Sequence, residues 1–214
     1  MRNESLSHPE SARALRLEYL SITLAALEAI VALVSGLIAG SVALVAFGAD
    51  SVIEMLSAIV VISQLLTLVR GHGQTPSSEH RSHRILAVLF YALALYVVAS
   101  VLQALVGAHH PRENTWGFAI SLFSSVAMPT LAWRKRNSGR ELAAQGLASL
   151  SRLMSADATE TALCAILAAT TLMGVSLAWL HWWWADPVAS LAVVYFALRE
   201  GREAWECASR EARD

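Results

Sequence analysis

Two short acidic clusters lie inside apolar segments, and their residue types and spacing suit the binding of a metal ion. Asp50 and Glu54 interrupt the apolar run from 41 to 68, and Glu160 and Cys164 have the same spacing in the run from 155 to 180. Residues four apart share one face of a helix, about 6 Å apart along its axis. Two such pairs on facing helices offer four oxygen and sulfur ligands, which suits tetrahedral coordination of a cation such as Zn²⁺.

Acids in these positions are costly if the segments cross a membrane. A charged carboxylate at the centre of a bilayer costs about 2.5–3.5 kcal/mol, so Asp50, Glu54 and Glu160 together would cost about 8–10 kcal/mol if unpaired. A shared cation offsets that cost most simply. Two alternatives stay open. Asp50 and Glu54 could be a protonated or helix-capped pair that lines water, and Glu160 could lie near the cytoplasmic surface, with Cys164 as a small core residue.

The elements that must position these side chains are six long apolar segments. Of the 214 residues, 56% are hydrophobic and only 15% are charged, whereas a soluble domain averages about 25% charged residues. A span needs about 20 apolar residues, and the expected spans are 19–38, 42–69, 84–107, 115–133, 157–180 and 184–199. We therefore expect an all-α membrane protein, a bundle of six transmembrane helices. Its expected parts are an N-terminal tail (1–17), the six-helix domain (18–205) and a short C-terminal tail (206–214).

The positive charges predict an orientation for this bundle. With six spans, 15 of the 16 Lys and Arg residues fall on one side of the membrane, and Arg112 alone falls on the other. Cytoplasmic loops are enriched in Lys and Arg, so both termini are predicted to be cytoplasmic. The charged stretch 134–140 is then expected in the loop between spans four and five, and the amphipathic run 141–154 is expected to extend span five.

Other functional classes find little support in the sequence. The net charge of −1 gives no broad basic surface for nucleic acid. Cys164 and Cys207 lie on different segments without CxxC spacing, so we expect free thiols. The chain has no HExxH motif, nucleophile elbow or phosphate-cradling glycine loop. An enzyme is therefore not expected, nor is a bound cofactor.

Several further polar residues are candidates for a secondary role. Asp157 lies one helical turn from Glu160 and either guides an ion toward the site or caps the N-terminus of its helix. Glu28 lies in the middle of the first span and either carries protons or hydrogen-bonds a neighbouring helix. Three histidines near the connection between spans two and three are either accessory metal ligands or part of a solvated loop: His72, His80 and His83.

The motifs around these residues resemble those of a known family. Gly48-Ala49-Asp50-Ser51-Val52-Ile53-Glu54 is similar to the second-span acidic DxxxD or HxxxD pair of the cation diffusion facilitator family. Ala156-Asp157-Ala158-Thr159-Glu160, followed by Cys164, resembles the family's AD-x-x-H-x-x-x-D segment in span five. Ala185-Asp186-Pro187, where Asp186 is expected to cap the helix that begins there, resembles the start of the last span. The resemblance covers roughly residues 18–205.

The resemblance implies a secondary transporter that exports divalent metal cations from the cytoplasm and forms a homodimer. The implied ligands are Asp50, Glu54, Glu160 and Cys164. Zn²⁺ is the expected substrate, and Cd²⁺, Co²⁺, Mn²⁺ and Fe²⁺ stay open. Because protons compete with metal for these ligands, metal/proton antiport is expected. Heavy use of Arg with a single Lys suggests a GC-rich bacterial genome, and the expected location is the bacterial inner membrane.

Two departures from the family pattern are visible. Cys164 stands where the family usually has Asp, which either favours a softer ion or weakens the site. The C-terminal cytoplasmic domain of many members is not expected here. Both departures motivate an alternative function, a non-transporting membrane protein that binds metal as a sensor or as a modulator of a partner protein.

Overall fold

Six long helices make up most of the part of the chain that the structure describes. The computed structural model describes residues 9–69, 76–107, 112, 114–146, 148–180, 182 and 184–211. The helices are α1 (Pro9–Ala39), α2 (Val42–Val69), α3 (Pro76–Gly107), α4 (Thr115–Ala144), α5 (Ala148–Trp179) and α6 (Ala185–Glu211). Within these residues there is no strand. The expected all-α class is confirmed.

Five of the six helices are long and apolar enough to cross a membrane. The qualifying stretches are Ala12–Ala39, Val42–Ser63, Ala87–Ala104, Thr115–Ala144 and Met154–Leu177. Helix α6 is not among them, because charged residues border its short apolar stretch between Asp186 and Arg199. Its crossing of the membrane therefore stays a prediction, as does the orientation of the termini.

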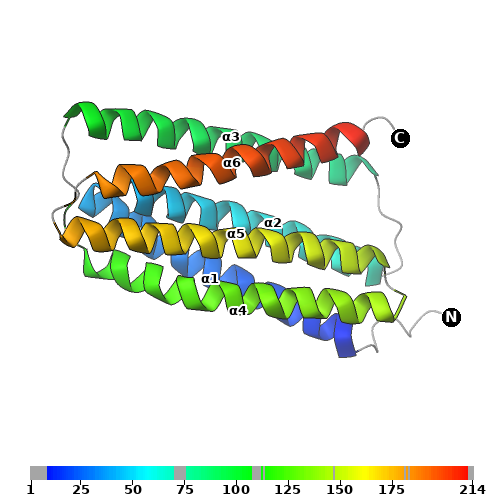
Figure 1. Cartoon of the computed structure of the whole chain (residues 1–214). Helices are drawn as coiled ribbons and strands as arrows, with labels where there is room; N and C mark the ends of the chain where they lie inside the picture. The colour runs from blue at the N-terminus through cyan, green and yellow to red at the C-terminus, as the bar shows by residue number, and fades with distance from the viewer. Residues whose placement is uncertain are drawn as a thin grey trace.

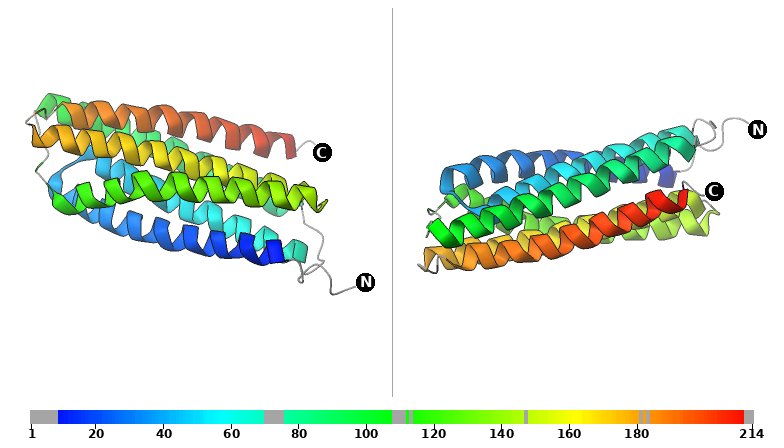
Figure 2. Two further views of the ribbon diagram at one scale, coloured as in Figure 1. Left: turned by 60° about the horizontal axis from the view of Figure 1, so that its bottom comes forward. Right: turned by 90° about the horizontal axis from the view of Figure 1, so that it is seen from above.

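The helices form two groups, which Figure 1 shows one above the other. Helices α1, α2, α4 and α5 pack in pairs as a four-helix core, in which α4 lies along α5 and α1 lies along α2. Helices α3 and α6 pack extensively on each other, and this α3–α6 pair contacts the core through α2 and α5. Helix α1 begins and helix α6 ends at the same end of the bundle (Figures 1 and 2).

The connection between α4 and α5 differs from the sequence prediction. The stretch 134–140 was expected in a charged loop, but α4 continues through it to Ala144, and α5 begins at Ala148. The helix continues because one face of this stretch is buried against the core at Lys135, Ser138, Gly139 and Leu142. The charge pattern failed here because Lys135 points into the protein, where acidic residues of other helices pair with it.

Two contacts fix α2 relative to its neighbours. Helices α1 and α2 approach closely at Gly36 and Gly48, where an added Cβ would lie within 2.8 Å of backbone nitrogens of the facing helix. At the start of α2, the Asp186 carboxylate accepts hydrogen bonds from the Val42 N–H at 2.9 Å and from the Ser41 hydroxyl. Asp186 was expected to cap its own helix. Instead it caps α2, because the turn before α6 carries its side chain to the free N–H groups of α2.

Candidate metal centre

Three buried side chains from three helices converge inside the four-helix core. Glu28 of α1, Glu54 of α2 and Cys164 of α5 each offer one ligand atom, and these atoms lie within 4.8 Å of one another. The three residues are 0%, 2% and 1% exposed, and all lie inside the candidate membrane spans. We call them the acidic centre. Carboxylate oxygen and thiolate sulfur at such separations can share one cation.

Glu28 is held in this position by hydroxyl and thiol groups of its neighbours. Its Oε1 accepts a hydrogen bond from the Ser124 hydroxyl of α4 at 2.6 Å. Its Oε2 accepts from the Ser51 hydroxyl of α2 at 3.4 Å and from the Cys164 thiol at 4.0 Å. Of the two roles considered for Glu28, hydrogen bonding to neighbouring helices is the one the structure shows. The sequence did not place Glu28 beside the other two ligands.

Glu54 is the least satisfied member of the centre. Both of its carboxylate oxygens are buried, and neither has a hydrogen-bond partner in the described part of the chain. A buried polar group without a partner costs free energy, and a charged one costs more. The two oxygens are therefore available as ligand atoms, with Cys164 and Thr161 among their polar neighbours.

The four metal ligands predicted from sequence line one cavity. Asp50 and Glu54 of α2 and Glu160 and Cys164 of α5 all border this small, largely enclosed space, together with Phe90 and residues 196, 197 and 200. The Glu160 carboxylate accepts a hydrogen bond from the Ser57 hydroxyl of α2, so α2 and α5 are tied together here. Asp50 and Glu160 lie outside the compact group of three, which leaves them as candidate outer ligands. Their role as ligands stays a prediction.

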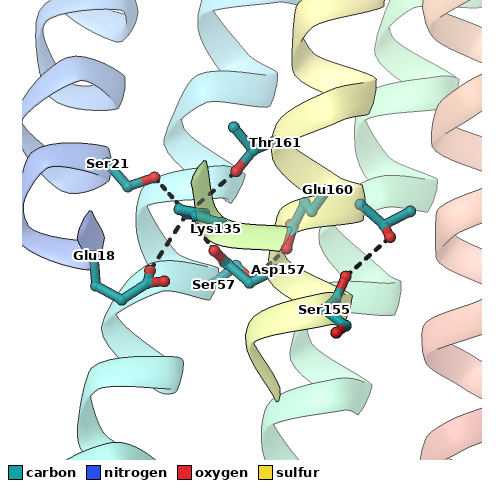
Figure 3. A network of polar contacts seen from close by, with 9 residues as sticks. Glu18, Ser21, Ser57, Lys135, Ser155, Asp157, Glu160 and Thr161 are labelled. Carbon is teal, nitrogen blue, oxygen red and sulfur yellow. Dashed lines mark hydrogen bonds and ion pairs between the residues drawn. The ribbon is translucent and has the colours of Figure 1, made fainter. Parts of the chain in front are cut away.

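A second buried network surrounds Lys135 of α4 (Figure 3). The Lys135 ammonium donates hydrogen bonds to Glu18 Oε2 at 3.4 Å and to the Ser21 hydroxyl at 2.8 Å, both on α1. It also donates to the Asp157 carboxylate and to the Thr161 hydroxyl at 3.2 Å, both on α5. We call these residues the Lys135 network. It joins α1, α4 and α5 through one positive charge.

Sequence reasoning missed Lys135 and Glu18, although a signal was present. Lys135 follows Met128 and Leu131 at the spacing of a buried helix face, and Ser138 and Leu142 continue that face. This periodicity indicates a helix that goes on past the predicted end of the span. Glu18 gives no comparable signal, because it falls at the predicted start of span one, where an acid needs no buried partner.

Asp157 belongs to the Lys135 network. Its carboxylate is 2% exposed and pairs with Lys135. The proposed cap of its own helix is wrong, because α5 begins at Ala148, more than two turns earlier. That Asp157 guides an ion stays a prediction.

Of the candidate accessory histidines, His72 lies outside the described residues. His80 and His83 fall on the first turns of α3, and their side chains lie outside the described part.

The fold and its apolar helices define an all-helical, multi-pass membrane protein with buried acids in its core. A family model described as the cation efflux transmembrane domain matches residues 19–210. The match covers most of the chain, so the protein belongs to the cation efflux family, which is the cation diffusion facilitator family that its motifs resemble. Membership makes it a metal cation transporter of the membrane. No curated protein matches the chain.

Proposed function

We propose that the protein exports Zn²⁺ in exchange for protons through the acidic centre. The observation that carries the proposal is the convergence of Glu28, Glu54 and Cys164, with ligand atoms within 4.8 Å of one another in the membrane spans. The free oxygens of Glu54 supply ligand atoms that no group of the described chain occupies. A divalent cation compensates the negative charge that these ligands carry when deprotonated.

The ligand chemistry favours Zn²⁺ over harder ions. Two carboxylates and one thiolate are ordinary zinc ligands, and four-coordinate zinc accepts them together with a further oxygen. Asp50 and Glu160 line the same cavity and are the nearest candidates for that oxygen. A thiolate ligand disfavours Mg²⁺ and Mn²⁺, which prefer carboxylate, carbonyl and water. Cd²⁺ and Co²⁺ are therefore closer competitors of Zn²⁺ than Mn²⁺ is.

Proton coupling follows from the same ligands. Zinc binds the deprotonated thiolate and carboxylates, so each bound ion displaces protons from them. Protons that enter from the opposite side compete for these atoms and release the ion. The centre lies in the enclosed middle of the bundle, so a relative movement of the helix groups must expose it to the two sides in turn. The proposal includes a homodimer in a bacterial inner membrane, with both termini cytoplasmic.

Zinc flux into proteoliposomes tests the proposal. The wild-type protein should accumulate Zn²⁺ when the vesicle lumen is acidic, and collapse of the pH gradient should slow the accumulation. Glu54→Gln should reduce the flux to the level of empty vesicles, because it removes one of the two carboxylate ligands of the acidic centre. Glu141→Gln is the matched control, since Glu141 pairs with Arg13 at the exposed end of α4. Zinc binding without flux in the wild-type protein would instead favour the sensor or modulator.

A further inference from the structure

The α3–α6 pair also contributes an acidic side chain, Glu200, to the cavity that the predicted ligands line. Glu200 of α6 lines the same space as Asp50, Glu54, Glu160 and Cys164. Glu200 lies 15 residues after the start of α6, and Cys164 lies 15 residues before the end of α5. Because α5 and α6 are consecutive, packed helices, both residues lie about 22 Å from the turn that joins them. Glu200 is therefore level with the acidic centre.

The Glu200 carboxylate forms no ion pair in the described part of the chain, although the Arg199 charge acts on it through space. Its Oε1 is buried and has no hydrogen-bond partner within the described residues. The neighbouring cations of α6 are engaged elsewhere, since Arg199 pairs with Glu203 at 3.1 Å and Arg202 pairs with Glu206 at 2.9 Å. Those pairs lie on the exposed face of α6, whereas Glu200 borders the cavity.

A second observation favours a cation as the ligand of this cavity. Glu54 is almost fully buried and lines the cavity, and neither of its oxygens has a hydrogen-bond partner in the described ranges. Asp50 and Glu200 are two further acids that line it, and like charges in a poorly solvated space repel each other. When these acids are deprotonated, a cation in the cavity compensates them, and no Lys or Arg is among its lining residues. Lys135, which acts on Glu54 electrostatically, belongs to the neighbouring network.

We propose that Glu200 is a ligand that the α3–α6 pair supplies to the transported cation. The inference rests on the proposed function, because it concerns the same ion. Glu28, Glu54 and Cys164 all belong to the four-helix core, so an ion held only by them would not contact the pair. An ion that also binds Glu200 joins α6 to α2 and α5. When protons replace the ion, this link between α6 and the core is lost. Occupancy of the site thereby sets the position of the pair.

Zinc titration of the purified full-length protein tests the ligand assignment, with Glu203 as the matched control. Glu203 lies three residues further along α6 and is exposed. Glu200→Gln should weaken Zn²⁺ binding about tenfold or more, the equivalent of one charge-assisted interaction. Glu200→Asp keeps the charge and should bind with intermediate affinity. Glu203→Gln should bind as the wild type does. Equal affinities for Glu200→Gln and Glu203→Gln would overturn the inference.

Two further measurements separate a ligand from a merely structural residue. In Co²⁺-loaded protein, the thiolate charge-transfer band of Cys164 should persist in Glu200→Gln, while the ligand-field bands change because an oxygen ligand is lost. In hydrogen exchange, Zn²⁺ should protect the middle of α6 in the wild type but not in Glu200→Gln. Unchanged ligand-field bands, or equal protection in both proteins, would overturn the inference.

Failure of this inference can be told from failure of the proposed function. If the wild type binds and transports Zn²⁺ and Glu54→Gln does not, the proposed function stands, whatever Glu200→Gln does. If the wild type neither binds nor transports Zn²⁺, the proposed function fails, and the assignment of Glu200 fails with it.

Discussion

The acidic centre and the Lys135 network are two buried polar clusters that share α1 and α5 but differ in how their acidic side chains are compensated. Each takes a glutamate from α1 and a residue from α5: Glu28 and Cys164 in the centre, Glu18 and Asp157 in the network. The network contains its own cation, which is fully buried and has four hydrogen-bond partners. The centre contains no Lys or Arg, and neither oxygen of Glu54 has a hydrogen-bond partner among the residues that the structure describes. The network's cation belongs to the fold, whereas the proposed function assigns the transported ion to the centre.

This difference predicts opposite effects on stability for the two groups. Breaking a buried ion pair leaves an uncompensated charge and is strongly destabilising, whereas removing an unpaired buried charge relieves a cost. The network is therefore expected to contribute to folding. The acids of the centre are expected to be retained for binding, at some expense in stability.

The largest expected effect is that of Lys135→Met, which should lower the free energy of unfolding by about 3–5 kcal/mol because Glu18 and Asp157 lose their shared cation. Thermal or denaturant unfolding in one detergent measures the change. Glu54→Gln, measured alongside, should be neutral or stabilising. The triple variant E18Q/K135M/D157N should recover much of the loss, since no buried charge remains unpaired. A Lys135→Met protein as stable as the wild type would remove the contrast between the two groups.

A smaller effect, on ion preference, is expected when the sulfur of the centre is replaced. Cys164→Ser keeps a polar side chain but removes the soft ligand, so the affinity for Cd²⁺ should fall about tenfold or more relative to that for Mn²⁺. Competition titrations with the two ions measure the ratio. Ser124→Ala, which removes a hydrogen bond to Glu28 without touching the sulfur, should leave the ratio unchanged. An unaltered ratio in Cys164→Ser would show that the thiol is only a core residue.

The smallest expected effect on stability is that of replacing Asp186, a buried acid whose carboxylate is hydrogen-bonded to the N-terminus of α2. Its carboxylate accepts hydrogen bonds from the Val42 N–H and the Ser41 hydroxyl at the start of α2. Asp186→Ala should cost about 1–2 kcal/mol of stability, the usual range for a lost cap, and Asp186→Asn should restore much of it because its side-chain oxygen still accepts. Zinc affinity should stay unchanged in both variants. A loss of zinc binding in Asp186→Asn would show that Asp186 acts on the site.

Local patterns predicted the part of the site that lies on single helices. The pairs Asp50–Glu54 and Glu160–Cys164 were recognisable because a spacing of four puts both side chains on one helix face, and an apolar surrounding makes acids costly. Their convergence on one cavity followed from pairing α2 with α5. The charged stretch 134–140 was misplaced, because charge density alone does not distinguish a solvated loop from a helix with one buried face.

Contacts between distant segments account for what local patterns missed. Lys135 is 117 residues from Glu18 and 22 from Asp157. Asp186 reaches the start of α2 across 144 residues. Glu28 joined the acidic centre only because α1 packs beside α2 and α4. None of these pairings has a spacing that could be recognised along the chain.

The sequence by itself determined that the chain is a helical membrane protein with acids in its apolar segments, because hydropathy and helical periodicity are properties of neighbouring residues. Tertiary structure alone decided which of those acids receive a cation from the chain and which are left without one. The reason is physical: whether a buried carboxylate is compensated depends on what lies within a few ångströms of it, and in this bundle that is set by the packing of helices far apart in the sequence.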